Sequence, residues 1–439
     1  MGWLRRANCG LASIVPRFFP SVSDSMRLIP CLLLSPVLLI ASSAEAAEPA
    51  WMQWRGPTRD GQVESLPDSL AGLTKQWSAA LPPSYSGPLA DADRVYTTAT
   101  ENKTDEVVVA YDRATGDELW RASWPGAMSV PFFAASNGSW IRATPALAGG
   151  KLYVAGMLDV LVCLDAATGD EVWRRNFPQE RSTQPPSFGY VASPLVHEGR
   201  VFVQAGSAVL ALDAETGQTV WEAMKTGSGM MDGAFSSPIL AADAPGGPQL
   251  LVQSRSTLAG LEPSSGEVLW STPVEAFRGM NILTPTPRTV DTPSGPELQV
   301  FTSSYGGGST LFAIPGGRGA VTTKWTNKSE AYMASPVSVA GRLIVPLRNQ
   351  RVAALDWETG QTVWTSTPYG KYWSMLTDGQ TVLALDQRGD LLRIDPAADS
   401  FTVIEERRIS PSETWAHVAW DGELLLIRRL DGLDVYAAK

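Results

Sequence analysis

Residues 110–120 read A-Y-D-R-A-T-G-D-E-L-W, and close copies of this stretch recur along the chain at a nearly constant spacing. Residues 211–221 and 354–364 keep the pattern A-x-D-x-x-T-G-x-x-x-W, and residues 163–173 change only its first position. Residues 260–270 carry a variant with Glu and Ser in place of the Asp and Thr. Because apolar residues alternate before the Asp and again after the Gly, D-x-x-T-G is predicted to be a hairpin turn between two strands.

One set of residues in these repeats is predicted to dock each repeat onto its neighbour. Asp and Thr side chains can bond the turn backbone, and Gly takes a positive φ without steric cost. Burial of the Trp ring should stabilise each junction by about 3–5 kcal/mol. The predicted docking residues are Asp112, Gly116, Trp120, Asp165, Gly169, Trp173, Asp213, Gly217, Trp221, Gly266, Trp270, Asp356, Gly360 and Trp364.

These repeats resemble the tryptophan-docking motif of the PQQ-like (pyrroloquinoline-quinone repeat) β-propeller family. That family includes the BamB-type outer-membrane assembly propellers and the quinoprotein alcohol dehydrogenases. Residues 54–61, W-R-G-P-T-R-D-G, are similar to the start of a subset of exported bacterial members. The resemblance implies an all-β fold, a β-propeller of four-stranded antiparallel blades. Its dehydrogenase branch would imply PQQ and calcium at the mouth of the central channel.

The spacing of the repeats predicts eight blades. Motif positions at 112, 165, 213, 262 and 356, with weaker copies near 315, 395 and 434, are separated by about 40–50 residues, as four-stranded blades require. The last copy lacks an outer strand, and residues 73–77 can supply one, which would close the ring. We therefore expect an N-terminal lead at 47–69 and a single propeller domain at 70–439, closed by pairing of its first and last strands.

The first 46 residues are predicted to be a signal peptide. An apolar run at 28–41 is followed by small residues at the −3 and −1 positions of a cut after Ala46. The run is too short for a permanent membrane span, and Cys31 lies too early in it for a lipid anchor. Met26 is an alternative start. We expect export to the periplasm or cell envelope, with no transmembrane segment in the mature chain.

Charge and cysteine content exclude some functions. The net charge is −10, and removal of residues 1–46 would make it more negative, so a nucleic-acid partner is not expected. Cys163 is the one cysteine beyond the predicted signal, so no intrachain disulfide can form there. It is expected to be a small buried apolar residue rather than a reactive thiol.

No sequence motif assigns a reaction to the chain. His197 and His417 lack metal-ligand spacing, and there is no G-x-S-x-G, H-E-x-x-H or phosphate-binding loop. The adjacent Cys pair of the quinoprotein alcohol dehydrogenases is absent as well. We therefore assign no catalytic, cofactor-binding or metal-binding residue. No cofactor is expected, and PQQ with calcium is the alternative.

The segments before the predicted inner strands carry small residues followed by Pro, such as Ser193-Pro194, whose hydroxyls are expected to line the channel. Most of these segments also carry an aromatic residue, and they should gather on one face of the propeller. The candidate ligand rim consists of Trp140, Arg142, Tyr190, Phe235, Asn281, Tyr332, Trp373 and Trp415. Two interpretations stay open, because these rings could cap the core between blades or line a funnel for a ligand.

The function expected from these observations is an exported, non-catalytic binding or scaffolding module. Its partner would be another envelope protein, a peptide, or a small ligand in the central funnel, and the chain would be a monomer. The alternative is a PQQ-dependent alcohol or sugar dehydrogenase.

Overall fold

The computed structural model describes residues 50–226 and 233–438 of the chain. The chain divides into two units, Met1–Ala47 and Glu48–Lys439, and all that follows concerns the second unit. The predicted signal peptide at 1–46 lies outside the described residues. No described helix has the length and apolar character needed to cross a membrane.

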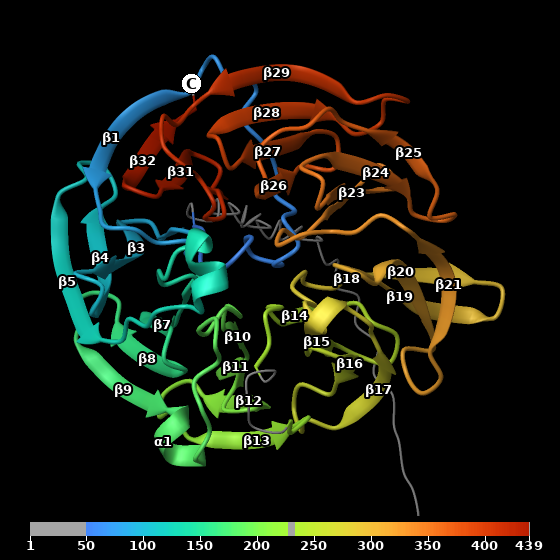
Figure 1. The fold of residues 1–439 in the computed structure, drawn as a ribbon, viewed down its shortest axis with the longest axis horizontal. Coiled ribbons are helices and arrows are strands. Elements are labelled where there is room, and N and C mark those ends of the chain that lie inside the picture. Colours follow the sequence, from blue (N-terminus) through green and yellow to red (C-terminus); the bar gives the residue numbers. More distant parts are fainter. Residues whose placement is uncertain (1–49, 227–232, 439) are drawn as a thin grey trace, which may run out of the picture. The chain divides into compact units, whose positions relative to one another are not determined.

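The second unit consists of eight four-stranded antiparallel sheets arranged around one axis, which confirms the predicted eight-bladed β-propeller (Figure 1). Blade 1 is formed by β2 (Leu89–Ala90), β3 (Arg94–Glu101), β4 (Asp105–Asp112) and β5 (Glu118–Pro125). Blade 2 is formed by β6 (Ala146–Ala148), β7 (Lys151–Gly156), β8 (Val160–Asp165) and β9 (Glu171–Asn176). Blade 3 is formed by β10 (Leu195–His197), β11 (Arg200–Ala205), β12 (Ala208–Asp213) and β13 (Thr219–Ala223). Blade 4 is formed by β14 (Ile239–Ala241), β15 (Gln249–Gln253), β16 (Thr257–Leu261) and β17 (Val268–Pro273).

The other four blades follow the same order from the axis outward. Blade 5 is formed by β18 (Thr286–Thr292), β19 (Gly295–Ser304), β20 (Gly308–Pro315) and β21 (Thr322–Asn327). Blade 6 is formed by β22 (Val337–Val339), β23 (Arg342–Pro346), β24 (Val352–Asp356) and β25 (Thr362–Thr365). Blade 7 is formed by β26 (Trp373–Thr377), β27 (Val382–Asp386), β28 (Asp390–Asp395) and β29 (Thr402–Arg408). Blade 8 is formed by β30 (Ala419–Trp420), β31 (Leu424–Arg429), β32 (Gly432–Ala437) and β1 (Thr74–Ala80).

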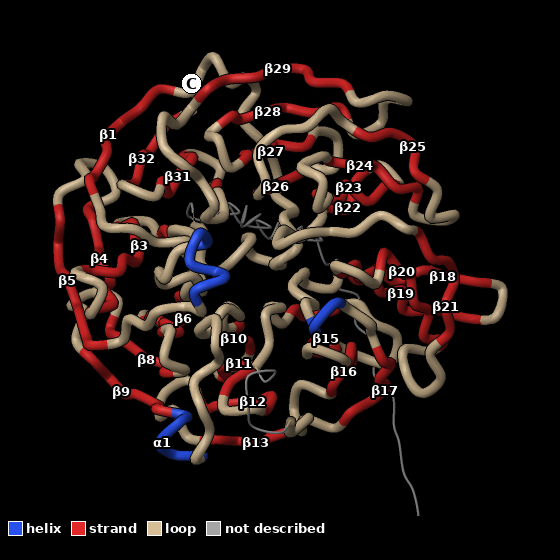
Figure 2. The backbone as a smooth tube through the Cα atoms, in the orientation of Figure 1, coloured by secondary structure: helices blue, strands red, loops and turns tan. Residues whose placement is uncertain are grey.

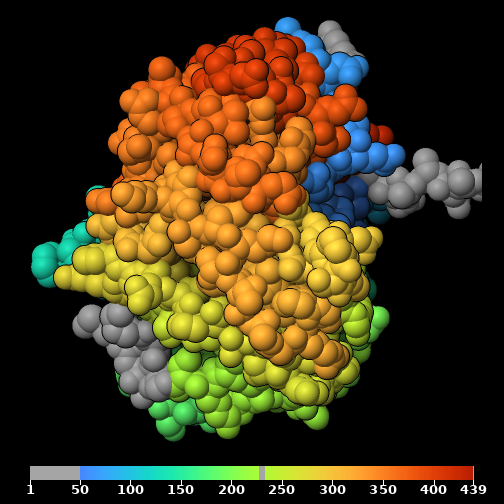
Figure 3. Space-filling view, turned by 90° about the vertical axis from the view of Figure 1, so that its right-hand side faces the viewer, coloured from blue at the N-terminus to red at the C-terminus, as the bar shows by residue number. Residues whose placement is uncertain are grey.

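Helices are few and short in the described residues, and they lie in the connections between strands (Figure 2). They are the 3₁₀ helix η1 (Phe132–Asn137), the α-helix α1 (Phe177–Arg181) and the 3₁₀ helix η2 (Phe277–Gly279). Seen from the side, blades that follow one another in sequence lie side by side (Figure 3). The connections carrying η1 and η2 overhang the central region of the ring (Figure 1).

Blade 8 contains strands from both ends of the propeller. β1 pairs antiparallel with β32, from Thr74 opposite Ala437 to Ala80 opposite Gly432. The first strand of the domain is therefore the outer strand of its last blade. This pairing joins the two ends of the ring and covers the edge of β32 that would otherwise be open.

Burial differs between the middle and the outer strands of a blade. In β12, the residues Ala208 to Leu212 are all buried, because both faces of a middle strand pack against neighbouring blades. In β5 the exposure alternates, because one face of an outer strand meets solvent. Cys163 belongs to the buried strand β8, where burial raises the pKa of its thiol to about 12.

A tryptophan of one blade docks onto the turn of the next blade. Trp120 Nε1 donates to the Ala166 carbonyl at 3.1 Å, and its ring packs against Gly169. The same bond is repeated by Trp173 to Ala214 O, Trp221 to Pro263 O, Trp77 to Arg113 O and Trp325 to Trp357 O. Packed against these rings are Gly217, Gly266, Gly116 and Gly360 respectively.

The turn that receives the ring is built by the Asp and Gly of the motif. Asp112 Oδ1 accepts from the amides of Ala114 and Thr115, and these bonds lower the pKa of the Asp112 carboxyl. Gly116 has a φ of +76°, and a Cβ there would lie 2.6 Å from Trp77 Cδ2. Asp165, Asp213 and Asp356 accept turn amides in the same way. The Gly is therefore required both by its backbone conformation and by the indole that covers it.

Two predicted docking tryptophans do not bond a turn carbonyl of the next blade directly, and the turns they face have neither D-x-x-T-G nor the E-x-x-S-G variant. Trp270 Nε1 donates to Gln249 Oε1 at 2.8 Å, and Gln249 Nε2 donates to Gly317 O in blade 5 at 2.7 Å. The Gln side chain thus relays the contact. Trp364 Nε1 has no hydrogen-bond partner among the described residues, and its ring packs edge-on against Phe401.

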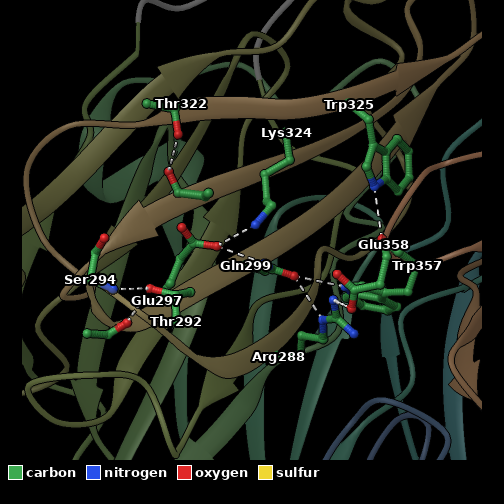
Figure 4. Close-up of polar contacts among 12 residues, drawn as sticks. Arg288, Thr292, Ser294, Glu297, Gln299, Thr322, Lys324, Trp325, Trp357 and Glu358 are labelled. Atoms are coloured by element: carbon green, nitrogen blue, oxygen red, sulfur yellow. Dashed lines mark hydrogen bonds and ion pairs between the residues drawn. The ribbon is translucent and has the colours of Figure 1, made fainter.

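The junction of blades 5 and 6 has an additional indole. Trp357, the residue after the motif Asp, donates from Nε1 to Gln299 Oε1 at 3.1 Å, and Arg288 lies 4.5 Å over its ring (Figure 4). Arg288 Nε also donates to Gln299 Oε1, at 2.9 Å. Since Trp325 binds the Trp357 carbonyl, the two blades each contribute one ring to this junction.

Replacing Trp221 by Ala should lower the free energy of unfolding by about 3–5 kcal/mol, because the change removes a buried ring. It also removes one of the two donors to the Pro263 carbonyl, the other being Arg200 Nη1. Equilibrium unfolding in urea measures this difference. Leu119→Ala, at an exposed position of the outer strand β5, is the control and should change the free energy by less than about 0.5 kcal/mol. Equal effects of the two changes would contradict the docking role.

Candidate functional site

The N-terminal lead occupies the centre of the ring. The segment 51–63 crosses the central region, where it appears in dark blue in Figure 1. Trp51 forms a bridge with Ala90 of blade 1, and Val63 N donates to Thr377 O of blade 7 at 2.9 Å. The lead therefore bonds to blades 1 and 7, the two neighbours of blade 8, and we call the segment 51–63 the plug.

Two arginines fix the plug by donating to main-chain carbonyls around the axis. Arg59 donates from Nε to Pro238 O at 2.9 Å, from Nη1 to Pro194 O at 2.7 Å and from Nη2 to Ser193 O at 2.9 Å. Arg55 Nη2 donates to Pro336 O. Both guanidinium groups are buried, and burial lowers the pKa of Arg55 to about 10 and that of Arg59 to about 9. Both therefore carry a positive charge at neutral pH.

The small hydroxyl residues before the inner strands link neighbouring blades. Thr144 N donates to Ser193 Oγ at 2.9 Å, and Ser193 N donates to Ser237 Oγ at 2.9 Å. Thr284 N donates to Ser335 Oγ at 3.1 Å. These bonds tie successive blades close to the axis, and the carbonyls that hold the plug arginines belong to the same segments.

A cavity of about 410 Å³ lies over the plug. Trp54 of the plug lines it together with His417, and the hydroxyl residues Ser193, Ser237, Thr284 and Ser335 border it. Its aromatic walls are Tyr85, Phe133, Phe188, Phe235, Phe277, Tyr332 and Trp415. Three arginines also line the cavity, namely Arg142, Arg255 and Arg278. A volume of this size matches the pockets that hold small organic ligands.

The cavity brings together four of the eight candidate rim residues, Arg142, Phe235, Tyr332 and Trp415. The structure places the other four elsewhere. Trp140 is half-buried beside Gly138 and is not part of the lining. Asn281 is buried and donates from Nδ2 to Arg255 O and Val274 O, so it shapes the loop around β17 and η2.

Tyr190 and Trp373 belong to the hydrophobic core. Tyr190 is 2% exposed and packs in the core, whereas the next residue, Val191, lines the cavity. Trp373 is 3% exposed and is the first residue of β26 rather than part of the preceding connection.

Sequence reasoning missed several lining residues, among them Trp54, Tyr85, Phe133 and Phe188. For Trp54 a signal existed, because it opens the W-R-G-P-T-R-D-G stretch. For Phe133 and Phe188 the signal was the unusual length of the connections between blades 1, 2 and 3. Tyr85 has no comparable signal, since it follows β1 in a segment that resembles an ordinary linker.

Contacts among the rings hold the walls in place. Trp415 stacks on Tyr372, with centroids 3.5 Å apart and an interplanar angle of 2°, and it also contacts Tyr85 at 4.2 Å. Trp54 meets His417 edge-on at 5.1 Å. Burial lowers the pKa of His417 to about 3, so its imidazole is neutral at physiological pH. The cavity is thus lined by side chains whose orientations are already determined.

The described lining of the cavity offers aromatic rings, hydroxyl groups, guanidinium groups and one imidazole. None of its described lining residues is Asp, Glu, Lys or Cys. Within residues 50–226 and 233–438, no group of three or more His, Cys, Asp or Glu side chains is placed to hold a metal ion. Ca²⁺ requires several oxygen ligands and favours carboxylates. The residues seen at this site therefore do not fit the calcium of a calcium–PQQ centre.

Comparison with known proteins relates the chain to two groups of propellers. The family model for "Outer membrane protein assembly factor BamB" matches residues 103–366. A protein of that name from Alteromonas naphthalenivorans is 26% identical over 222 residues, which are 49% of this chain and 46% of the relative. Quinohemoprotein alcohol dehydrogenase ADH IIB of Pseudomonas putida is 31% identical over 142 residues, which are 30% of this chain and 19% of the relative. The chain thus spans about half the length of the first of these curated relatives.

Solved structures show the same fold. BamB from Moraxella catarrhalis superposes with a TM-score of 0.58 at 16% identity, over 83% of this chain and 99% of that one. A europium-containing methanol dehydrogenase superposes with a TM-score of 0.66 at 12% identity, over 89% of this chain and 98% of that one. At such low identities the likeness concerns the fold alone.

Replacing Arg59 by Met should lower the free energy of unfolding by about 2–5 kcal/mol, because three buried carbonyls lose their donor. Urea unfolding of the whole chain measures the loss. Arg318→Met provides the matched control, since this arginine lies half-exposed in a turn of blade 5. If Arg59→Met proved no more damaging than Arg318→Met, the plug would not depend on the carbonyl bonds.

Proposed function

This chain belongs to the family of outer membrane protein assembly factor BamB, and on that premise we propose that it is an exported, non-catalytic binding module of the cell envelope. Its site is the aromatic cavity over the plug. The expected occupant is a small ligand or a segment of another envelope protein. The chain would act as a monomer.

The observation that carries this proposal is the arrangement of the cavity walls. Trp415 packs against Tyr372 and Tyr85, and Trp54, a residue of the plug, packs against His417. Rings that are already ordered lose little conformational entropy when a ligand binds, so the gain from burying an apolar surface is largely kept. Such a lining suits binding, and its described residues include no carboxylate or Lys that could act as a base.

The proposed location follows from the predicted signal peptide and from the name of the related assembly factors. The rim of the cavity also offers apolar contact area, because Phe132 is 90% exposed and Phe133 is 60% exposed. A net charge of −10 makes nucleic acid an unfavourable partner. We therefore place the partner of this chain among envelope proteins, peptides and small ligands.

A second candidate function is PQQ-dependent oxidation of an alcohol or sugar. The matches to quinohemoprotein alcohol dehydrogenases favour it, although they cover only 30% and 26% of the chain. The described cavity residues count against it, because they include no carboxylate to ligate calcium or to serve as a base.

Binding in the cavity can be tested with the neutral fluorescent probe N-phenyl-1-naphthylamine. One molecule per chain should bind, because the probe is flat and apolar, and Trp415→Ala combined with Tyr332→Ala should weaken binding at least tenfold. Ile404→Ala serves as the control, since this exposed residue of the outer strand β29 is not part of the lining. Circular dichroism would verify that each variant is folded. Absence of saturable binding to the unaltered chain would refute a ligand-binding cavity.

The same protein distinguishes binding from catalysis. After incubation with PQQ and Ca²⁺, dye-coupled oxidation of short alcohols and of glucose should stay at the level of a control without PQQ. Turnover that requires PQQ would overturn the non-catalytic assignment in favour of the dehydrogenase.

A further inference from the structure

The cavity over the plug is basic, although the protein as a whole is acidic. Arg142, Arg255 and Arg278 line it, and no described lining residue is Asp or Glu. Two more arginines lie behind Trp54, because the Cζ atoms of Arg55 and Arg59 are each 5.4 Å from its ring centroid. Five guanidinium groups therefore line this site or lie close to it in a chain whose net charge is −10, while the carboxyl groups that act nearby are those of Asp60 on Arg55 and Glu413 on Tyr85.

The guanidinium groups of Arg142 and Arg59 donate their hydrogen bonds mainly to main-chain carbonyl oxygens. Arg142 donates from Nε to Trp140 O and from Nη2 to Gly138 O, both at 3.1 Å. Arg59 also donates mainly to main-chain carbonyls, with Gln53 Oε1 as a further acceptor. A carbonyl is a dipole, so it satisfies the donor without cancelling the charge. The positive potential of these groups therefore reaches the cavity.

The low polarity of the walls strengthens this potential. Burial lowers the pKa of Arg142 to about 10, so its guanidinium remains charged at neutral pH. The charge lies near Tyr85 and Tyr372, and its burial limits screening by water. An anion placed here would gain more from the arginines than it would at the protein surface, where water screens the charges.

The walls also specify the shape of the ligand body. Phe235 lies beneath the guanidinium of Arg255, with Cζ 4.6 Å from the ring centroid, and Trp415 is stacked on Tyr372. Flat rings held in fixed orientations favour a flat partner that can stack or meet them edge-on. The cavity volume of about 410 Å³ suits a small molecule better than a folded or extended polypeptide segment.

We propose that this cavity binds a small carboxylate with a flat, apolar body, whose anionic group faces Arg142 while its body lies among Phe235, Tyr332 and Trp415. The proposal rests on the proposed binding function and adds the chemical class of the ligand to it.

The test compares 2-naphthoate with 2-naphthamide, which has the same body without the charge. Calorimetric titration of the intact chain at low salt should show that naphthoate binds at least tenfold more tightly. The ratio should fall as salt rises from about 50 to 500 mM, because the preference is electrostatic. A ratio below two at low salt overturns the proposal, while neutral-probe binding would still support the proposed function.

Variants test whether Arg142 causes the preference for naphthoate over naphthamide. Arg142→Met should reduce the naphthoate-to-naphthamide ratio at least fivefold, and Arg142→Lys should retain most of it. Arg318→Met, a charge removal in a turn of blade 5, should leave the ratio unchanged. If Arg142→Met fails to fold, the ratio of the unaltered chain and its salt dependence decide the matter. Binding of a Glu-rich hexapeptide in preference to naphthoate would overturn the proposal and assign the cavity to a peptide.

Discussion

The hydrogen bond from an indole of one blade to a turn carbonyl of the next is the interaction on which the ring depends. A blade has two apolar faces, and each is stable only when it is covered by a neighbour. The bond from Trp120 to Ala166 O illustrates how the repeat achieves this, because the Asp shapes the turn and the Gly leaves room for the ring. Where the next turn lacks the motif, the contact persists through Gln249 or is reduced to ring packing at Trp364.

A ring of eight blades leaves an opening at its axis. The plug, which precedes the first strand in the sequence, fills that opening. The segments before the inner strands present backbone carbonyls toward the axis, and Arg59 and Arg55 supply the donors for them. Because these two arginines are buried in the plug, their positive charges lie close to the Trp54 ring that lines the cavity. The W-R-G-P-T-R-D-G stretch therefore supplies both the residues that fill the axis and two of the positive charges near the cavity.

The repeat makes the fold predictable, whereas the site is predictable only in part. Asp, Gly and Trp at fixed spacing have local roles, so five blades can be located from these residues, and the weaker copies near 315, 395 and 434 complete the count of eight. Cavity membership depends instead on the direction in which each side chain of a connection points, and this separates Tyr190 in the core from its neighbour Val191 in the lining. The role of Arg59 cannot be inferred from its own segment, because its partners lie in blades more than a hundred residues away.

A basic, aromatic ligand site at the centre of the propeller is the central claim, and a crystal structure with 6-bromo-2-naphthoate tests it most directly. The anomalous signal of bromine locates the ligand without reference to the protein coordinates. The expected result is one peak within the cavity, among Phe235, Tyr332 and Trp415, with the carboxylate directed toward Arg142. Peaks confined to the outer surface of the blades, or no peak at saturating ligand, would contradict the claim.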